Sequence, residues 1–229
     1  MTDTFFKGMD ISSLLEVERC HGCFYDGNSR KDLFAILQKY GVNLIRLRLW
    51  NDPFDEEGNS YLGGGCDLDT VRKLALRAQS AHMEWMLDFH YSDTWADPSR
   101  QIVPSDWQSL TSVEAVANAI SEYTTKVLTA LKEQAAVTPY YVQIGNEINN
   151  GLLLHTGYNS STTYGSGDFA YAGEKSSENV VTYLAAASKA VRDFNQNIRI
   201  VVHVTSSNSP TILLDKLKTG KSLNLEMLI

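Results

Sequence analysis

The stretch YYVQIGNEINNGLLLHTG, residues 140–157, begins as a short apolar run and then places a polar pair, Asn146 and Glu147, side by side. The run is rich in Tyr, Val and Ile, which favour strands, and Gly145 and Gly151 allow the backbone to turn sharply around the pair. The stretch therefore predicts a buried strand with an amide and a carboxylic acid at its carboxyl end. A partly desolvated carboxyl group can have a raised pKa, which suits a proton donor near neutral pH.

Similar apolar runs, rich in Val, Ile, Leu and Tyr, alternate along the chain with longer segments of helical period. We expect strands at residues 6–12, 42–50, 84–92, 140–147, 198–204 and 223–229. We expect helices between them at residues 30–40, 67–82, 113–134, 174–195 and 209–219. This alternation predicts a single α/β domain over residues 1–229, in which βα units surround a parallel sheet.

Polar side chains gather at the carboxyl ends of the expected strands. They are Asp10, Arg46, Arg48, His90, Tyr91, Asp93, Asn146, Glu147 and His203. In a TIM (β/α)8 barrel the active site is built at these strand ends and in the loops that follow them. A doubly wound sheet also binds ligands there, but the sequence has no Gly-rich phosphate-binding turn after its first strand. The pattern favours the barrel, with one polar rim.

Arg46 and Arg48 lie two residues apart in an expected strand, so they share one face while Ile45, Leu47 and Leu49 share the other. Both guanidinium groups are expected to point into the barrel. A buried cation needs a carboxylate partner. An arginine bonded to a nucleophilic carboxylate would keep that carboxylate ionised and oriented.

The segment DFHYSDTWADP, residues 88–98, concentrates aromatic and polar side chains at a strand end. Sugars present apolar ring faces and many hydroxyl groups, so Trp95 is expected to act as a platform and Asp93 to supply polar contacts. A glycosidic bond also needs a general acid, for which Glu147 is the candidate, with Asn146 bonded to a sugar hydroxyl. Two alternatives remain open: Glu147 caps the next segment or pairs with an arginine, and His90 is a satisfied core residue.

Composition excludes several other classes of function. The net charge is −7 and the pI is about 5.2, without a cluster of Lys and Arg, so no nucleic-acid partner is expected. No apolar run reaches the roughly 18 to 20 residues of a membrane span, and the start has no signal peptide. Cys20 and Cys23 form a C-x-x-C, but a second pair is missing and Cys66 makes the count odd. We therefore expect free thiols, no metal and no cofactor.

The motifs KGMDIS, GVNLIRLRLWNDP, LDFHYSDTWADP and QIGNEINNGLL, in this order and at these spacings, closely resemble the endo-β-1,4-galactanases of glycoside hydrolase family 53. The resemblance implies a (β/α)8 barrel and hydrolysis, with retention, of β-1,4-galactan in the type I arabinogalactan side chains of pectin. It implies Glu147 as acid/base and Asn146 as its companion. The expected substrate-binding residues are Asp10, Arg46, Arg48, Trp50, His90, Tyr91, Asp93, Trp95 and His203.

The resemblance also implies a second carboxylate, a nucleophilic Glu on the seventh strand of the barrel. No residue here matches that motif, and Glu226 lies in the stretch expected as the sixth strand, so we do not assign it as the nucleophile. We expect this chain to supply about the first five to six βα units of the barrel, truncated at its carboxyl end, and to have absent or residual activity by itself.

Two other functions stay open: a non-catalytic galactan-binding protein, and a related barrel glycosidase acting on a different β-1,4-glycan. The expected partner is a neutral polysaccharide, with neither nucleic acid nor membrane involved, and the complete protein is expected to be a monomer. The family is usually exported, whereas no signal peptide is seen here, so localisation stays open between the cytoplasm and a mature or truncated secreted form.

Overall fold

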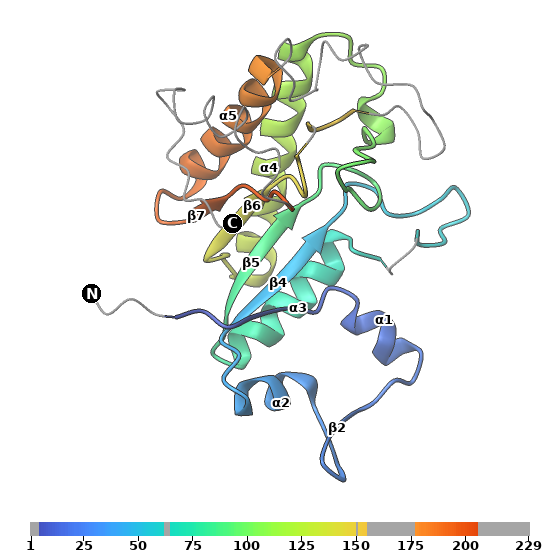
Figure 1. Ribbon diagram of the computed structural model, residues 1–229, viewed down its shortest axis with the longest axis vertical. Coiled ribbons are helices and arrows are strands. Elements are labelled where there is room, and N and C mark those ends of the chain that lie inside the picture. The colour runs from blue at the N-terminus through green and yellow to red at the C-terminus, as the bar shows by residue number, and fades with distance from the viewer. Residues whose placement is uncertain (1–4, 62–64, 150, 155–176, 206–229) are drawn as a thin grey trace.

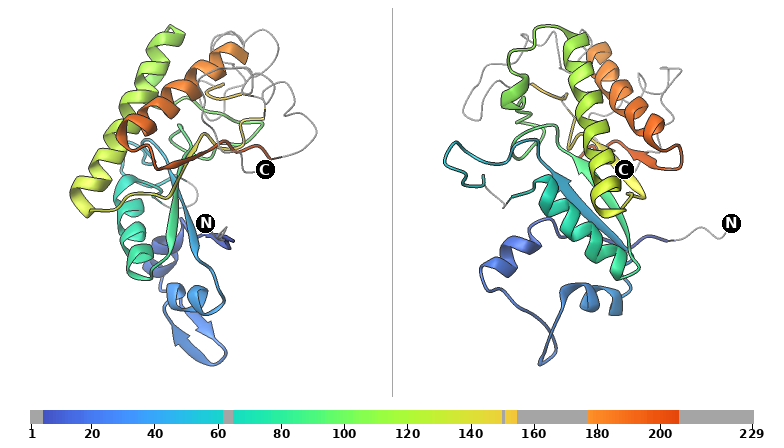
Figure 2. Two further views of the ribbon diagram at one scale, coloured as in Figure 1. Left: turned by 90° about the vertical axis from the view of Figure 1, so that its left-hand side faces the viewer. Right: turned by 180° about the vertical axis from the view of Figure 1, so that it is seen from behind.

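The computed structural model describes residues 5–61, 65–149, 151–154 and 177–205 (Figures 1 and 2). Within these ranges one parallel sheet has the order β1-β4-β5-β6-β7. Its strands are β1 Gly8–Asp10, β4 Leu44–Leu49, β5 Glu84–Phe89, β6 Tyr141–Ile144 and β7 Arg199–Val201. Each strand pairs in parallel with the strand that follows it in this order. Consecutive parallel strands joined by helices are the construction of a (β/α)8 barrel wall.

Three helices of the described residues begin at capping side chains. The helices of these residues are α1 Leu14–Arg19, α2 Leu33–Lys39, α3 Leu68–Ser80, α4 Val113–Ala135 and α5 Ser177–Phe194, with a 3-10 turn, η1, at Ser105–Trp107. Asp32, Asp67 and Ser112 cap α2, α3 and α4 by accepting backbone N–H groups of the first turn. No helix in the described part of the chain is both long and apolar enough to cross a membrane.

The two faces of the sheet differ in chemistry. Ile45, Leu47 and Leu49 are fully buried on the face that packs against the helices, which lie on one side of the strands in the left view of Figure 2. Arg46 and Arg48 occupy the other face, as the two-residue alternation predicts. The helix-covered face therefore supplies the apolar core, and the opposite face is available for polar chemistry.

The expected strands and helices are present in the described residues, with shorter bounds at most ends. The prediction omitted α1 and an antiparallel hairpin formed by β2 Phe24–Asp26 and β3 Ser29–Lys31. The helix expected from residue 30 begins at Leu33, because Arg30 and Lys31 belong to the hairpin and Asp32 is the cap. The helix expected at 209–219 and the strand expected at 223–229 lie outside the described residues.

Core packing in this sheet predicts a large effect for Leu87→Ala. Leu87 is fully buried at the centre of β5, so truncation should lower the free energy of unfolding by about 2–5 kcal/mol, measured by urea denaturation. Val17, which is 40% exposed on α1, gives the matched control Val17→Ala, with an expected loss within about 0.5 kcal/mol. Equal losses for the two variants would contradict the assignment of β5 to the core.

Candidate active site at the carboxyl rim of the sheet

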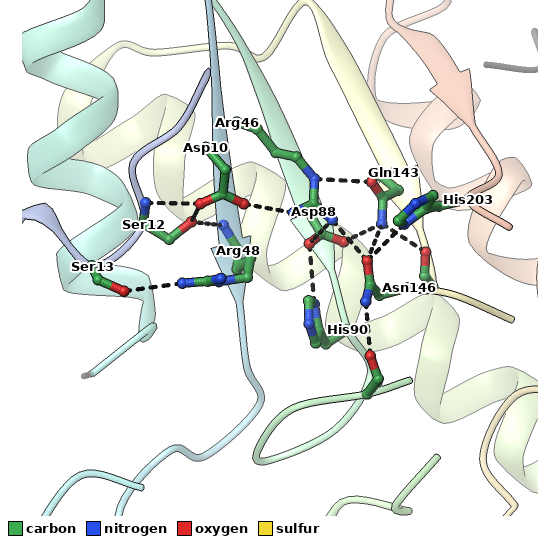
Figure 3. A network of polar contacts seen from close by, with 12 residues as sticks. Asp10, Ser12, Ser13, Arg46, Arg48, Asp88, His90, Gln143, Asn146 and His203 are labelled. Carbon is green, nitrogen blue, oxygen red and sulfur yellow. Dashed lines mark hydrogen bonds and ion pairs between the residues drawn. The ribbon is translucent and has the colours of Figure 1, made fainter. Parts of the chain in front are cut away.

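Arg46 on β4 is the centre of a polar network on the inner face of the sheet (Figure 3). Its Nη1 lies 2.6 Å from Asp10 Oδ2, and its Nη2 lies 2.7 Å from Asp88 Oδ2. Its Nε donates to Gln143 Oε1 at 3.2 Å, and Nη2 also donates to Asn146 Oδ1 at 2.8 Å. One side chain thereby joins β1, β5, β6 and the turn after β6.

Asp88 is the buried anion of this network. Its Oδ1 accepts a hydrogen bond from Gln143 Nε2 at 2.6 Å, and its Oδ2 lies 3.1 Å from Nδ1 of the fully buried His90. Burial by itself would raise the pKa of Asp88, but its interactions with His90 and Arg46 outweigh burial and hold that pKa below its ordinary value. Asp88 is therefore a carboxylate in the folded protein at neutral pH.

Asn146 is held in one orientation by its neighbours. Its Nδ2 donates to the Ala96 carbonyl at 2.8 Å, while its Oδ1 accepts from Arg46, from Gln143 and, at 2.8 Å, from Nδ1 of His203. Since Oδ1 can only accept, His203 carries a proton on Nδ1. The amide has a second N–H on Nδ2, which is the hydrogen-bond donor that it can offer to a ligand.

The backbone turn at residues 145–148 is fastened to its surroundings. Gly145 has φ +86°, and a Cβ there would lie 2.9 Å from Ile148 Cγ2, so both conformation and space favour glycine. The Gly145 N–H bonds to the Phe89 carbonyl, the Asn146 carbonyl accepts from Gln101, and the Ile148 N–H bonds to the His203 carbonyl. These bonds hold the residue between them, Glu147, in place.

Glu147 has φ +51°, a conformation that non-glycine residues rarely adopt and that is found disproportionately at functional sites. Its side chain is half-buried, and within the described ranges its carboxylate has no ion pair or hydrogen bond. Its negative charge nevertheless acts on Arg46 and on His203. Glu147 therefore lies beside the polar network but forms no ion pair with it among the described residues.

Trp95 forms the aromatic wall of the rim. Its indole is 37% exposed, and its ring centre lies 6.1 Å from His90 and 5.6 Å from Trp50, which is itself fully buried. The Arg48 guanidinium lies over the Trp95 ring at 4.1 Å, a cation–π contact. Trp50 and Arg48 therefore support the platform, and Trp95 presents its open face.

Of two further residues expected at the rim, Tyr91 is turned into the core and Asp93 is bonded to backbone groups. Tyr91 has φ +51°, which turns its ring away from the inner face; it stacks on Phe89 and its hydroxyl bonds to Thr124 of α4. Asp93 accepts the backbone N–H groups of Asp52 and Ser105, so it fastens two loops together. Burial raises the pKa of Asp93.

Two network members, Asp88 and Gln143, were not among the residues predicted from the sequence. Both lie inside strands rather than at their ends, on the same inner face as Arg46. The two-residue alternation of a strand could have identified both residues as inward-facing. Asp88 precedes His90 by two positions, and Gln143 follows Tyr141 by two positions, so each pair shares one face of its strand. Charged or amide side chains at inward positions of a buried strand indicate a paired network.

Metal ligation has no support in the described residues, which contain no group of three or more His, Cys, Asp or Glu side chains able to hold an ion. Cys20 and Cys23 are exposed, Cys66 is buried, and all three are free thiols. The site is thus built from carboxylates, amides, imidazoles and aromatic rings, which suits acid/base chemistry on a neutral, hydroxyl-rich ligand.

The sheet order and the polar rim define a (β/α)8-barrel protein with its site at the carboxyl ends of the strands. The chain belongs to glycosyl hydrolase family 53, whose sequence profile matches residues 6–225. It is 36% identical over 207 residues to the endo-beta-1,4-galactanase of Bacillus subtilis (strain 168), covering 90% of this chain and 43% of that protein. It is 33% identical over 204 residues to the arabinogalactan endo-beta-1,4-galactanase of Cellvibrio japonicus (strain Ueda107), covering 87% and 49%.

A solved structure, the Ignisphaera aggregans GH53 catalytic domain, superposes with a TM-score of 0.79 at 36% identity. The superposition covers 93% of this chain and 55% of that one. The chain therefore spans about half the length of the curated relatives that it matches. The likeness confirms the predicted fold class: the described strands are consecutive members of a (β/α)8 barrel wall.

The buried charge of Asp88 predicts a pH-dependent loss of stability in Asp88→Asn. The variant leaves Arg46 with one carboxylate, so unfolding free energy at pH 7 should fall by about 3–5 kcal/mol, measured by urea denaturation. Because the folded pKa of Asp88 lies below 3.8, the stability that its charge adds is present above about pH 4. The difference between wild type and variant should shrink as pH falls through that folded pKa.

The control for this experiment is Asp69→Asn, which breaks exposed ion pairs with Arg72 and Lys73 on α3. Its expected cost is below about 1 kcal/mol. If Asp88→Asn cost no more than this control at pH 7, Asp88 would not be the anion that stabilises Arg46.

The placement of Glu147 can be tested through His203. Burial and the charge of Arg46 lower the pKa of His203 below 6.5, while the negative charges of Asp88 and Glu147 oppose that shift. Glu147→Gln should therefore lower the pKa of His203 further, as followed by NMR titration of its ring protons. Glu84→Gln, at the opposite end of β5, should leave the titration unchanged. An unchanged His203 pKa in Glu147→Gln would place the carboxylate elsewhere.

Proposed function

We propose that this chain carries the acid/base half of a retaining endo-β-1,4-galactanase acting on galactan and type I arabinogalactan side chains of pectin. The observation that carries the proposal is Glu147, a half-buried carboxylate without a protein partner in the described ranges, held beside Asn146 on the polar rim. The relatives in family 53 that are named as endo-β-1,4-galactanases support the choice of reaction and of glycan.

Glu147 is the proton donor in this mechanism. The oxygen of a glycosidic bond is a poor leaving group until it is protonated, and Glu147 supplies that proton in the first step. In the second step the resulting carboxylate takes a proton from the water that releases the sugar from the enzyme. The strained turn fixes the direction of the side chain, so that one group can serve both steps.

The remaining rim residues bind and orient the sugar. The second N–H of the Asn146 amide is directed by the three donors on Oδ1 and is available to a sugar hydroxyl group. Trp95 offers its exposed ring to the apolar face of a galactose unit. Arg46 adds a positive field that favours the ionised form of a nucleophilic carboxylate placed opposite Glu147.

The nucleophile has to come from elsewhere, because the other acids at the rim already have partners. Asp10 and Asp88 both pair with Arg46, and Asp93 accepts two backbone hydrogen bonds. A retaining mechanism needs a second carboxylate about 5 to 5.5 Å from the acid. The proposal assigns that role to a residue outside the described ranges, as the family resemblance implies.

The test is a chimaera in which residues 1–229 are fused to the carboxyl-terminal part of the Bacillus subtilis relative, so that the nucleophile is supplied. New reducing ends released from β-1,4-galactan should fall by about 10²- to 10⁴-fold in Glu147→Gln, which keeps the shape of the acid but removes its proton. Tyr25→Ala, an exposed residue on the distant hairpin, should leave turnover unchanged.

Other outcomes would favour the alternative functions. Galactan hydrolysis near the unsubstituted level in Glu147→Gln would remove Glu147 from the mechanism. Galactan binding without any reducing ends from the chimaera would indicate a non-catalytic binding protein. Activity on mannan, xylan or glucan in place of galactan would assign the chain to a different β-1,4-glycan.

A further inference from the structure

A cavity of about 450 Å³ lies beside the rim, between the turn that follows β1 and the loop that follows β4. Its walls include Ser12, Ser13, Phe54, Asn59, Ser60 and Thr70. This volume is in the range of roughly 300–1,000 Å³ that is usual for small-molecule sites. Hydroxyl and amide groups share the wall with charged side chains of α1 and of the start of α3, and the ring of Phe54, 36% exposed, adds an apolar surface.

The charges around the cavity cancel. Glu16 and Arg19 form an ion pair with contacts of 2.6 Å and 2.8 Å, so neither is left to attract a charged ligand. Lys73 pairs with Asp69 at 2.5 Å, and Asp67 caps α3 by accepting the Thr70 N–H. Hydroxyl groups, an amide and one aromatic ring without net charge fit a neutral sugar, and do not fit an anionic one.

Arg48 links the cavity wall to the rim by side-chain contacts. Its guanidinium donates to Ser13 Oγ at 3.1 Å (Figure 3). The same guanidinium lies over the Trp95 ring, at 4.1 Å from its centre. The adjacent Ser12 hydroxyl accepts the Arg48 backbone N–H at 2.8 Å and donates to Asp10 of the Arg46 network at 2.7 Å. The same two serines line the cavity, so the cavity wall and the rim share hydrogen-bonded side chains.

The loop that forms the far wall is fixed by its own hydrogen bonds. Asp55 Oδ1 accepts the backbone N–H groups of Glu57 and Asn59, and its Oδ2 accepts Asn59 Nδ2. Phe54 and Ser60 pair across the loop as an isolated antiparallel bridge. Phe54 and Asn59 are therefore held at defined positions before any ligand arrives, which lowers the entropic cost of binding.

We infer that this cavity is a remote glycan subsite, which binds a neutral galactosyl unit of the substrate chain beyond the sugars at the Trp95 platform. The inference rests on the proposed function, since it takes the ligand to be a β-1,4-galactan chain. The turn after β1 and the loop after β4 then select longer galactan chains over shorter ones. They also select neutral chains over chains of uronic acids.

The experiment measures binding of β-1,4-galactobiose, galactotetraose and galactohexaose to residues 1–229 by isothermal titration calorimetry. The hexaose should bind about tenfold more tightly than the biose, because only the longer chain reaches Phe54. Phe54→Ala, which removes the ring, and Ser60→Trp, which fills the cavity, should each abolish that gain and leave biose binding unchanged. Tyr25→Ala, another exposed aromatic, should retain the gain.

The outcomes separate this inference from the function on which it rests. Equal affinity for biose and hexaose, or a full gain in both cavity variants, would overturn the subsite and leave the galactanase proposal standing. Failure of every galactan oligosaccharide to bind would overturn both. Equally tight binding of a galacturonic acid hexamer would overturn the selection for neutral chains. Melting curves of the variants, matched to wild type, would show that any loss is not unfolding.

Discussion

The site depends on one half-buried cation, the guanidinium of Arg46. Removing a charged group from water costs several kcal/mol, and this cost is tolerable only with well-placed anions. Asp10 of β1 and Asp88 of β5 provide them from the strands on either side of β4. A register shift of one residue in β4 would turn Arg46 toward the helices, on the apolar face that Ile45 and Leu47 now occupy. The ion network therefore stabilises only the observed strand register.

The network also explains why Glu147 differs from the other acids of the rim. Asp10 and Asp88 compensate Arg46, and the Asn146 amide receives three of the available donors. Glu147 is then left half-buried beside positive charge, but without a direct partner among the described residues. A group that must give and retake a proton has to be free in this way, whereas a paired carboxylate would hold one protonation state.

Much of this arrangement could be predicted from the sequence, because the alternation of apolar strands and amphipathic helices placed the polar strand ends on one rim. Asp88 and Gln143 were not predicted, because only polar residues at the ends of the expected strands were taken as candidates. Both residues point inward from within β5 and β6. Tyr91 was expected at the rim, and only the backbone angle at that position, which a sequence pattern does not reveal, turns its ring into the core. The hairpin after α1 had a local signal in Gly27-Asn28, the two residues between the paired Asp26 and Ser29, because glycine in a two-residue loop is typical of tight hairpin turns.

The charge balance of the rim bears on the choice of substrate. Galactan side chains are neutral, whereas the backbone of pectin carries a carboxylate on each galacturonic acid unit. The cations nearest the platform are not free: Arg46 is neutralised by two aspartates, and Arg48 lies over the Trp95 ring and bonds to Ser13. The protein also carries a net charge of −7, which repels a polyanion over distances within the Debye length. These compensated cations and the negative net charge accord with the proposed function, because they favour a neutral glycan over a polyanion.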